Sequence, residues 1–442
     1  MNCSIKSVEF TDFKLALRRF VMDVCQVLVQ TGVPNRRWMR IIHENDKTSL
    51  VQEERSDFSE PLDRLMRGLL EKPPESLKQV IGTINKTPTL ASIFVGGGGD
   101  SSRDQASIVW WATNILGGQF IQAYFAQAPS TIFSEPVFEL VFQRLIRDIE
   151  SSTRTVHNLN PLINTRLINS ERIDVAPGLV IRRLTDDELE EWLNDYLNEP
   201  VFSDISGMRV FDICQMNCAI DVTYDLRKHE NWESPKDLLS SVTDILTTLR
   251  ILTDQNVHIA FTKQISDSFF HSSAGRSPSI PHRPIGAVAN IEASINQSVI
   301  DLWNRIHSLP NGSPMKLALK RWDMVSERFD EYDKLIDYWI AFESLFASDS
   351  SQEVTYRASL RIAALIGNTS EEKVQLYKDL RESYKLRSEV VHGSVPKNKK
   401  NAYLLVDKTR SYLRRALLKL LSSGQAFDPA AMEIELLSQY KG

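Results

Sequence analysis

The chain has 442 residues, of which 42% are hydrophobic and 25% are charged, and its formal net charge is -5. This length and composition are typical of two or three globular domains, and the negative charge argues against a general affinity for nucleic acids, so DNA is not an expected partner. The four cysteines (Cys3, Cys25, Cys214 and Cys218) suggest no disulfide framework. No apolar run is long enough for a membrane span, and Met1 to Lys6 lead into a charged amphipathic segment, which indicates a cytoplasmic protein.

Residues 1–165 are predicted to be mostly helical. Apolar residues recur at helical spacing through residues 9–31, and Gly32 and Pro34 end that helix. Further helices are expected within residues 60–86, where Pro73 and Pro74 break the pattern, and over residues 104–128 and 134–150. The glycine-rich stretch from Gly96 to Ser102 lacks the Gly-Lys-Ser/Thr ending of a phosphate-binding loop, so it is predicted to be a flexible loop before a helix.

The pattern changes near residue 166, and residues 166–270 are predicted to form an α/β region. Strands are expected at residues 179–184, 208–226 and 257–262. Thr185 and Glu188 have the spacing of a capping box and predict the start of a helix, and an amphipathic helix is expected over residues 236–252. Residues 271–290, rich in Ser, Pro and Gly up to residue 286, are predicted to be a linker.

Residues 291–425 are predicted to form an all-α bundle, followed by a tail at residues 426–442. The expected helices have short connections and lie at residues 292–308, 315–348, 353–366, 371–392 and 400–422. Thr369 and Glu372 have the spacing of a capping box and predict the start of the fourth of these helices. The predicted fold class is therefore multidomain and predominantly α, with a helical N-terminal region, an α/β middle region and a C-terminal helical bundle.

The stretch from Tyr384 to Ser394 predicts the end of a helix. Gly393 occupies the position of a left-handed cap, and Pro396 prevents the helix from continuing. His392 therefore lies in the final turn, where the helix dipole favours a cationic imidazole. Arg387 is five positions earlier, so the two side chains point about 140° apart on a straight helix. They converge only if Arg387 swings round or if a second chain completes the site.

An arginine, four intervening residues and a histidine at a helix end form the ribonuclease signature of HEPN domains. Two further blocks, Leu335 to Phe346 and Tyr356 to Arg361, precede this one. In this order the three blocks resemble the Apea-like branch of the HEPN superfamily, which is found in prokaryotic defence proteins. The resemblance covers roughly residues 313–422. Ser388 follows the arginine, where many HEPN ribonucleases have Asn, Asp or His.

The resemblance implies a metal-independent endoribonuclease without a cofactor, in an antiviral defence or toxin role. In such an enzyme the ribose 2′-hydroxyl attacks its own phosphodiester and leaves a 2′,3′-cyclic phosphate. His392 would transfer protons and Arg387 would stabilise the charge on the phosphate. Ser388, Lys385 and Lys397 are candidates for binding the RNA substrate. The resemblance also implies a homodimer, because such sites usually form at a two-fold interface.

The charge distribution agrees with an RNA substrate held locally. Residues 313–425 contain about 20 Lys and Arg residues against about 15 Asp and Glu residues, so this part is mildly basic on an acidic chain. The eight histidines show no zincin or zinc-finger spacing, so no metal site is expected.

Three alternatives remain open. Arg387 could be a surface residue paired with a carboxylate, with His392 as a helix cap. The bundle could be a non-catalytic module for dimerisation or RNA binding. Alternatively, residues 166–270 could bind a small ligand, with the bundle as the output of a regulator.

Overall fold

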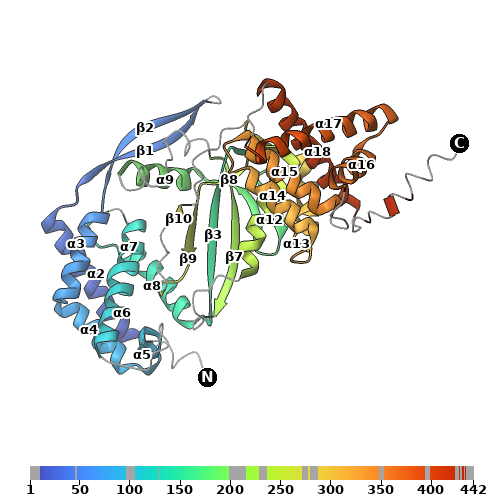
Figure 1. Cartoon of the computed structure of the whole chain (residues 1–442). Coiled ribbons are helices and arrows are strands. Elements are labelled where there is room, and N and C mark those ends of the chain that lie inside the picture. Colours follow the sequence, from blue (N-terminus) through green and yellow to red (C-terminus); the bar gives the residue numbers. More distant parts are fainter. Residues whose placement is uncertain are drawn as a thin grey trace.

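The computed structural model describes residues 10–44, 47–95, 105–128, 130–198, 216–227, 236–270, 277–278, 287–347, 353–393, 399–423, 428, 431–432 and 434. Figure 1 shows three parts in chain order: N-terminal helices, a central sheet and C-terminal helices. The chain is predominantly helical with some antiparallel sheet, which confirms the predicted fold class at this level. Among the described residues, no helix is both long and apolar enough to cross a membrane.

The N-terminal part buries the apolar faces of its helices in one core. Helix α2 (Thr11–Thr31) places Phe13, Leu17, Phe20 and Leu28 in this core, at the spacing seen in the sequence. The break near Pro73 and Pro74 is confirmed, because it separates α3 from α4. The other helices are α3 (Ser59–Glu71), α4 (Glu75–Lys86), α5 (Pro88–Val95), α6 (Gln105–Ala112), the π-helix η1 (Thr113–Phe120), α7 (Ile121–Gln127) and α8 (Glu135–Glu150). The glycine-rich stretch at residues 96–102 lies outside the described residues.

A β-hairpin interrupts the N-terminal helices and was not predicted. Strands β1 (Asn35–Glu44) and β2 (Lys47–Ser56) pair antiparallel over their whole length. In Figure 1 the hairpin extends from the N-terminal helices to α9 (Asp186–Asn198). Met39 exchanges backbone hydrogen bonds with the side chain of Asn194, at 2.7 and 2.9 Å. The hairpin therefore links the N-terminal helices to the middle of the chain.

The central sheet has the strand order β10-β9-β3-β7-β6-β5, with β8 also paired to β3, and all its neighbours are antiparallel. A separate two-stranded ribbon pairs β4 with β11 in parallel. The bounds are β3 (Thr153–Ile163), β4 (Thr165–Ile168), β5 (Arg172–Ala176), β6 (Leu179–Arg183), β7 (Cys218–Arg227), β8 (His258–Ile259), β9 (Phe261–Ser266), β10 (Ser277–Pro278) and β11 (Ala289–Glu292).

These strands change two of the expected boundaries. The sheet begins at Thr153, so the expected division at residue 166 falls inside β4. The expected linker at residues 271–290 contains β10 and the start of β11; its residues 271–276 and 279–286 lie outside the described part. Composition did not show either strand, because each is fixed by a partner distant in the sequence.

Helices cover both faces of the sheet. On one face, α12 (Lys236–Thr253) and α13 (Asn296–His307) pack against an apolar layer that includes Ile181 and Ile220. On the other face, Trp192 of α9 packs edge to face on Phe261, with ring centroids 5.1 Å apart. The capping box at the start of α9 is confirmed by hydrogen bonds of 2.9 and 3.2 Å between Thr185 and Glu188.

The C-terminal helices share one core, and most of their expected limits are confirmed. They are α14 (Pro314–Val325), α15 (Glu331–Phe346), α16 (Val354–Ile366), α17 (Ser370–Val391) and α18 (Lys399–Ser423). The single helix expected over residues 315–348 is wrong. It is two helices, because Asp330 caps a new start by accepting hydrogen bonds from the backbone of Tyr332 and Asp333.

Candidate functional site

Helix α17 holds the predicted catalytic pair and is fixed along its length by polar contacts. At its start, the hydroxyl of Thr369 accepts a hydrogen bond from the backbone of Glu372, as the capping-box pattern predicts. Further along, the buried carboxylate of Asp379 accepts hydrogen bonds from Lys408 and Tyr412 of α18, at 3.0 and 2.7 Å. One turn later, Ser383 accepts a hydrogen bond from the indole of Trp339 on α15. These contacts define where the last turns of α17 point.

The end of α17 agrees with the cap that the sequence predicts. The backbone N–H of His392 donates to the carbonyl of Ser388, and that of Gly393 to Val390. Gly393 has a φ of 77°, a left-handed conformation that favours glycine. The side chain of His392 is exposed and contacts no other described residue through a hydrogen bond or an ion pair. Its ring is therefore accessible at the carbonyl end of the helix.

Arg387 lies five positions before His392 and faces α15. Its Nη2 is 3.7 Å from Oε1 of Glu343, and its guanidinium lies 5.6 Å from the ring centroid of Tyr384. The side chain is 23% exposed, and its Nε is buried without a hydrogen-bond partner. A buried donor without an acceptor is unfavourable. An anion that approached from the open side would give this guanidinium the acceptors it lacks.

Structural arginines of the same helical part are paired differently. Arg321 and Arg328 both donate to the buried carboxylate of Asp337, each at 2.9 Å, although Nε of Arg321, like that of Arg387, has no hydrogen-bond partner among the described residues. Arg415 binds Glu372 at 2.7 Å. These distances are those of hydrogen-bonded ion pairs, whereas the contact between Arg387 and Glu343 is too long for a hydrogen bond. Arg387 thus has donors that no described residue accepts.

Glu343 was not predicted as a site residue. It belongs to the first of the three sequence blocks, but its relation to Arg387 depends on the packing of α15 against α17. Burial raises the pKa of Glu343, and the positive charge of Arg387 opposes this rise.

Tyr384 was also not predicted as a site residue. It packs between Arg387 and Trp339, and the ring centroids of Tyr384 and Trp339 are 4.9 Å apart.

The structure places the remaining predicted site residues as follows. Ser388 is half-buried on α17, Lys385 is exposed on the same helix, and Lys397 lies outside the described residues. Arg387 and His392 both belong to the last turns of α17 but do not share a face: Arg387 turns towards α15 and His392 is exposed at the helix end. One chain therefore presents the two groups in different directions.

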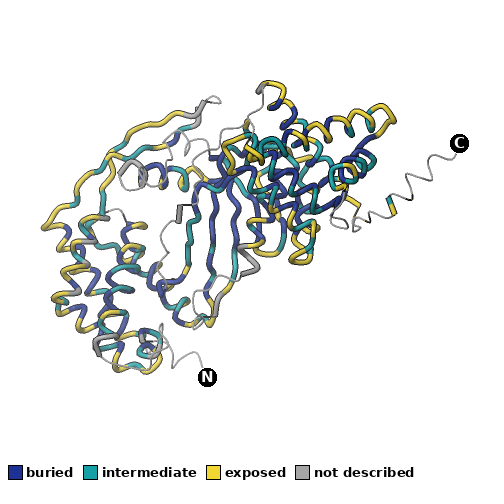
Figure 2. The backbone as a smooth tube through the Cα atoms, in the orientation of Figure 1, coloured by how far each residue is buried: buried dark blue, intermediate teal, exposed yellow. Residues whose placement is uncertain are grey.

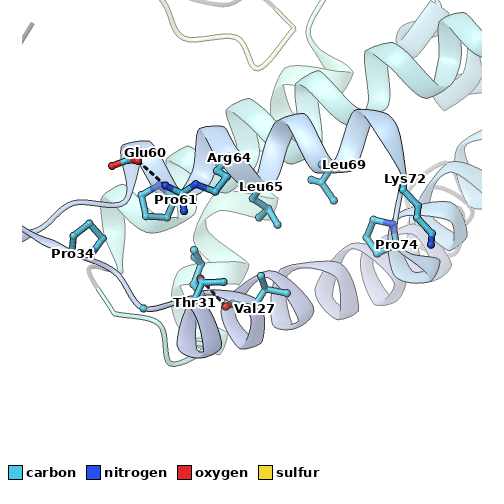
Figure 3. A pocket seen from close by; sticks show the side chains of 13 residues that line it. Val27, Thr31, Pro34, Glu60, Pro61, Arg64, Leu65, Leu69, Lys72 and Pro74 are labelled. Atoms are coloured by element: carbon cyan, nitrogen blue, oxygen red, sulfur yellow. Dashed lines mark hydrogen bonds and ion pairs between the residues drawn. The ribbon is translucent and has the colours of Figure 1, made fainter.

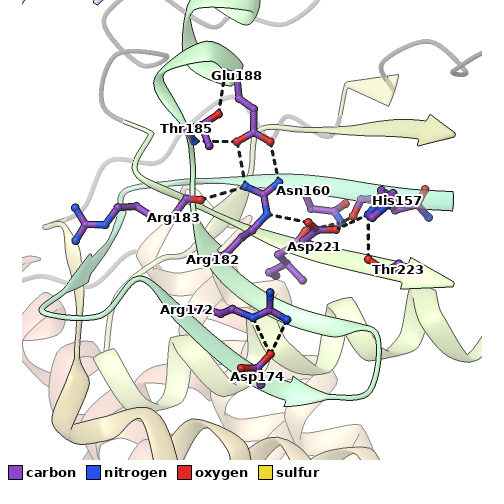
Figure 4. Close-up of polar contacts among 12 residues, drawn as sticks. His157, Asn160, Arg172, Asp174, Arg182, Arg183, Thr185, Glu188, Asp221 and Thr223 are labelled. Carbon is purple, nitrogen blue, oxygen red and sulfur yellow. Dashed lines mark hydrogen bonds and ion pairs between the residues drawn. The ribbon is translucent and has the colours of Figure 1, made fainter. Parts of the chain in front are cut away.

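A second charged cluster lies on the sheet face that α9 covers (Figure 4). Arg182 donates two hydrogen bonds to Glu188 of α9, at 3.0 and 2.7 Å, and one to Asp221 at 2.8 Å. Nδ1 of His157 is 3.0 Å from the hydroxyl of Thr223 and 3.7 Å from Asp221. The charges are matched within the cluster, so it fixes α9 to the sheet and does not resemble a reactive centre.

The pKa values in this cluster follow from its contacts. The nearby carboxylate of Asp221 raises the pKa of His157 against the effect of burial. Burial acts to raise the pKa of Asp221, but the contact with His157 and the hydrogen bond from Arg182 lower it overall. The pKa of Glu188 is lowered in the same way, since hydrogen bonds from Arg182 and Thr185 outweigh its burial.

A cavity of about 630 Å³ lies between α2 and α3 (Figure 3). Helix α2 packs mainly on α4, whereas α3 packs mainly on η1. This arrangement leaves space between α2 and α3. Leu28 and Leu69 are buried at its base, and the charged residues on its lining are Glu60, Arg64 and Lys72. Gly68 also lines the cavity, and a Cβ atom placed there would meet no atom within 4 Å. This volume is typical of small-molecule sites.

Across the described ranges, no three His, Cys, Asp or Glu side chains come together in an arrangement that could hold a metal ion. No protein-family model matches this chain, and no curated protein or solved structure matches it either.

Proposed function

We propose that the chain is a metal-independent endoribonuclease of the HEPN type, with Arg387 and His392 as catalytic residues, acting in the cytoplasm in antiviral defence or as a toxin. The observation that supports this most directly is the lack of close hydrogen-bond acceptors around the guanidinium of Arg387. Its Nε is buried without an acceptor and its ion pair with Glu343 is loose. A phosphate oxygen is the natural partner for such a guanidinium.

The proposed reaction is an internal transfer within the RNA. The 2′-hydroxyl oxygen forms a bond to phosphorus while the bond from phosphorus to the 5′-oxygen breaks. A base takes the proton of the 2′-hydroxyl, and an acid gives a proton to the leaving 5′-oxygen. Imidazole suits both roles near neutral pH, and His392 is exposed for them. Arg387 would stabilise the negative charge that develops on the phosphate oxygens.

The products are a 2′,3′-cyclic phosphate and a 5′-hydroxyl. One His392 supplies one proton-transfer group, and Arg387 turns to another side of α17. The proposal therefore includes a homodimer in which two copies of the helix end surround one phosphate. Ser388 and Lys385 would contact the RNA next to this phosphate, together with Lys397.

A second candidate function is a ligand-sensing regulator, and the cavity between α2 and α3 favours it. This cavity lies in the N-terminal helices, whereas the sequence suggested a ligand site within residues 166–270. The two functions are compatible, since a ligand in the N-terminal part could restrain or release a nuclease at the other end of the chain.

Purified protein incubated with total RNA and with tRNA, with and without EDTA, tests the nuclease. We expect cleavage that resists EDTA and leaves 2′,3′-cyclic phosphate ends. Arg387→Ala and His392→Ala should abolish it without lowering the melting temperature, whereas Lys320→Ala, an exposed lysine of α14, should not affect it. If both variants cleave like an active wild type, Arg387 and His392 are not the catalytic residues. If the wild type does not cleave RNA at all, a non-catalytic module is the better description.

A further inference from the structure

A row of polar and aromatic side chains leads along α17 to His392; Tyr377 and Ser388 in it are half-buried, and the other three are exposed. With about 100° per residue, Tyr377, Arg381, Lys385, Ser388 and His392 all lie within about 80° of one another around the helix axis. Burial agrees with this arrangement. Leu376, Leu380, Ser383 and Leu386 face the core, while Arg381, Lys385 and His392 are exposed. Figure 2 shows the exposed residues of α17 on the outer side of the C-terminal helices.

The first half of this row combines two tyrosines with an arginine. Tyr356 of α16 is 50% exposed, and its ring contacts that of Tyr377 edge to face, with centroids 6.2 Å apart. The guanidinium of Arg381 lies 5.8 Å from the centroid of Tyr377 and donates a weak 3.4 Å hydrogen bond to its hydroxyl. Aromatic faces and arginine planes are the groups on which single-stranded nucleic acids stack their bases.

The cations of the row are not neutralised within the described part of the chain. Arg381 forms no ion pair with any described carboxylate, and Lys385 forms none either. Other cations of these helices are paired, such as Lys408 with Asp379 at 3.0 Å and Lys334 with Glu331 at 2.6 Å. Arg381 and Lys385 thus each present a cation outside any ion pair with a described residue, one turn apart, between the tyrosines and His392.

We propose that Tyr356, Tyr377, Arg381 and Lys385 form a binding track for single-stranded RNA that guides the strand to His392. The distance along α17 from Tyr377 to His392 is about 22 Å, which is enough for a short run of nucleotides. The tyrosines stack bases at the far end, and the two cations contact phosphates on the way to the helix end. The track rests on the proposed ribonuclease function and specifies its substrate: single-stranded RNA of relaxed sequence, because every base has a face that can stack.

The test separates binding from cleavage by using His392→Ala as a non-cleaving background. Binding of a fluorescently labelled single-stranded RNA to this chain is measured by anisotropy over a range of salt concentrations. Tyr356→Ala should weaken binding by about fivefold to a hundredfold, the range found for loss of one stacked base. Arg381→Ala and Lys385→Ala should each weaken it and reduce the salt slope by about 0.7, the value for one phosphate contact on a single strand.

Two matched controls lie away from the track. Trp110 of α6 is also 50% exposed and pairs edge to face with Trp111, so Trp110→Ala removes an equivalent aromatic group. Lys320→Ala removes an exposed lysine from α14. Neither should change RNA binding. Thermal unfolding checks that the Tyr356→Ala variant keeps its fold. Tyr356→Phe keeps the stacking ring, so it should bind RNA as tightly as the His392→Ala chain in which it is made.

The outcomes distinguish the track from the nuclease. If the His392→Ala chain binds no RNA, or if the three track variants bind as tightly as the controls, the track is wrong even when the wild type cleaves RNA. If the variants weaken binding but the wild type never cleaves RNA, the track stands as a binding site and the proposed nuclease fails.

Discussion

Nη2 of Arg387 lies 3.7 Å from Oε1 of Glu343, and this contact joins the end of α17 to the end of α15. It is longer than a hydrogen bond, so it restrains the guanidinium while leaving its donors available. Glu343 itself is half-buried, and burial raises its pKa against the effect of Arg387. We infer that Glu343 is a positioning residue that sets the direction of the arginine.

Glu343→Gln should lower RNA cleavage by roughly tenfold to a hundredfold, the cost of misplacing a catalytic group slightly. Because the proposed role of Arg387 is to stabilise charge that develops in the transition state, the loss should appear in kcat with little change in KM. Steady-state kinetics on one RNA substrate measure this. Ser344→Ala is the control, since among the described residues this neighbouring hydroxyl donates only to the backbone carbonyls of Pro314 and Ala341. An equal loss in both variants would indicate general damage to α15.

The cluster between α9 and the sheet predicts how stability depends on pH. Burial opposes the ionisation of Glu188, but Arg182 and Thr185 lower its pKa overall. A lowered pKa means that its contribution to folding is complete above the ordinary pKa of glutamate and is lost as the pH falls through the lowered value. For His157 the pKa is raised, so its contribution is present at acidic pH and is lost as the pH rises through the raised value.

Glu188→Gln should therefore destabilise the protein by about 2 kcal/mol at neutral pH, the typical value of charge-assisted hydrogen bonds. It should also make the loss of stability in acid less steep. Chemical denaturation at a series of pH values measures both effects. Glu191→Gln is the control on the same helix, because Glu191 is 49% exposed and its one ion pair within the described part of the chain is with Lys263. An acid dependence unchanged by Glu188→Gln would show that the cluster contributes no pH-dependent stability.

Local signals in the sequence predicted the helix ends well. The caps depend on hydrogen bonds or backbone angles within a few residues, so the sequence alone is sufficient to predict them. They are the pairs Thr369 and Glu372, Thr185 and Glu188, and the glycine Gly393. The start of α15 had such a signal as well, since Asp330 is a good N-cap residue. However, apolar residues such as Phe329 and Tyr332 continue at helical spacing across it, which concealed the break.

Features that depend on distant partners were missed. The hairpin at residues 35–56 is rich in charge and lacks a clear alternation, and the hydrogen bonds of Met39 with Asn194 come from a helix far along the chain. Glu343 was missed for the same reason, because only the crossing of α15 and α17 brings it to Arg387. The sequence thus predicted Arg387 and His392 as candidates, while their surroundings required the structure.

The cavity between α2 and α3 predicts a binding effect that depends on Gly68. A Cβ atom at Gly68 or at Gly82 of α4 would meet no atom within 4 Å, so Ala at either position should raise the free energy of unfolding by about 1 kcal/mol. Of these two glycines, Gly68 lines the cavity and Gly82 does not. Gly68→Leu should therefore abolish binding of an anionic hydrophobic dye to the native protein, and Gly82→Leu should leave it intact. Equal dye binding by both variants would mean that the cavity is not a ligand site.

The last prediction concerns the homodimer. Arg387 turns towards α15 while His392 is exposed at the end of α17, so one chain presents one arginine and one histidine in different directions. Two chains related by a two-fold axis would bring two of each to one phosphate. An Arg387→Ala chain and a His392→Ala chain, each inactive alone, should regain measurable RNA cleavage after unfolding and refolding together. Mixing either variant with a Lys320→Ala chain controls for the refolding step. Native mass spectrometry should detect the mixed dimer in the same sample. A mixed dimer that forms without cleavage, or a strictly monomeric wild type that cleaves RNA, would show that the site is not shared.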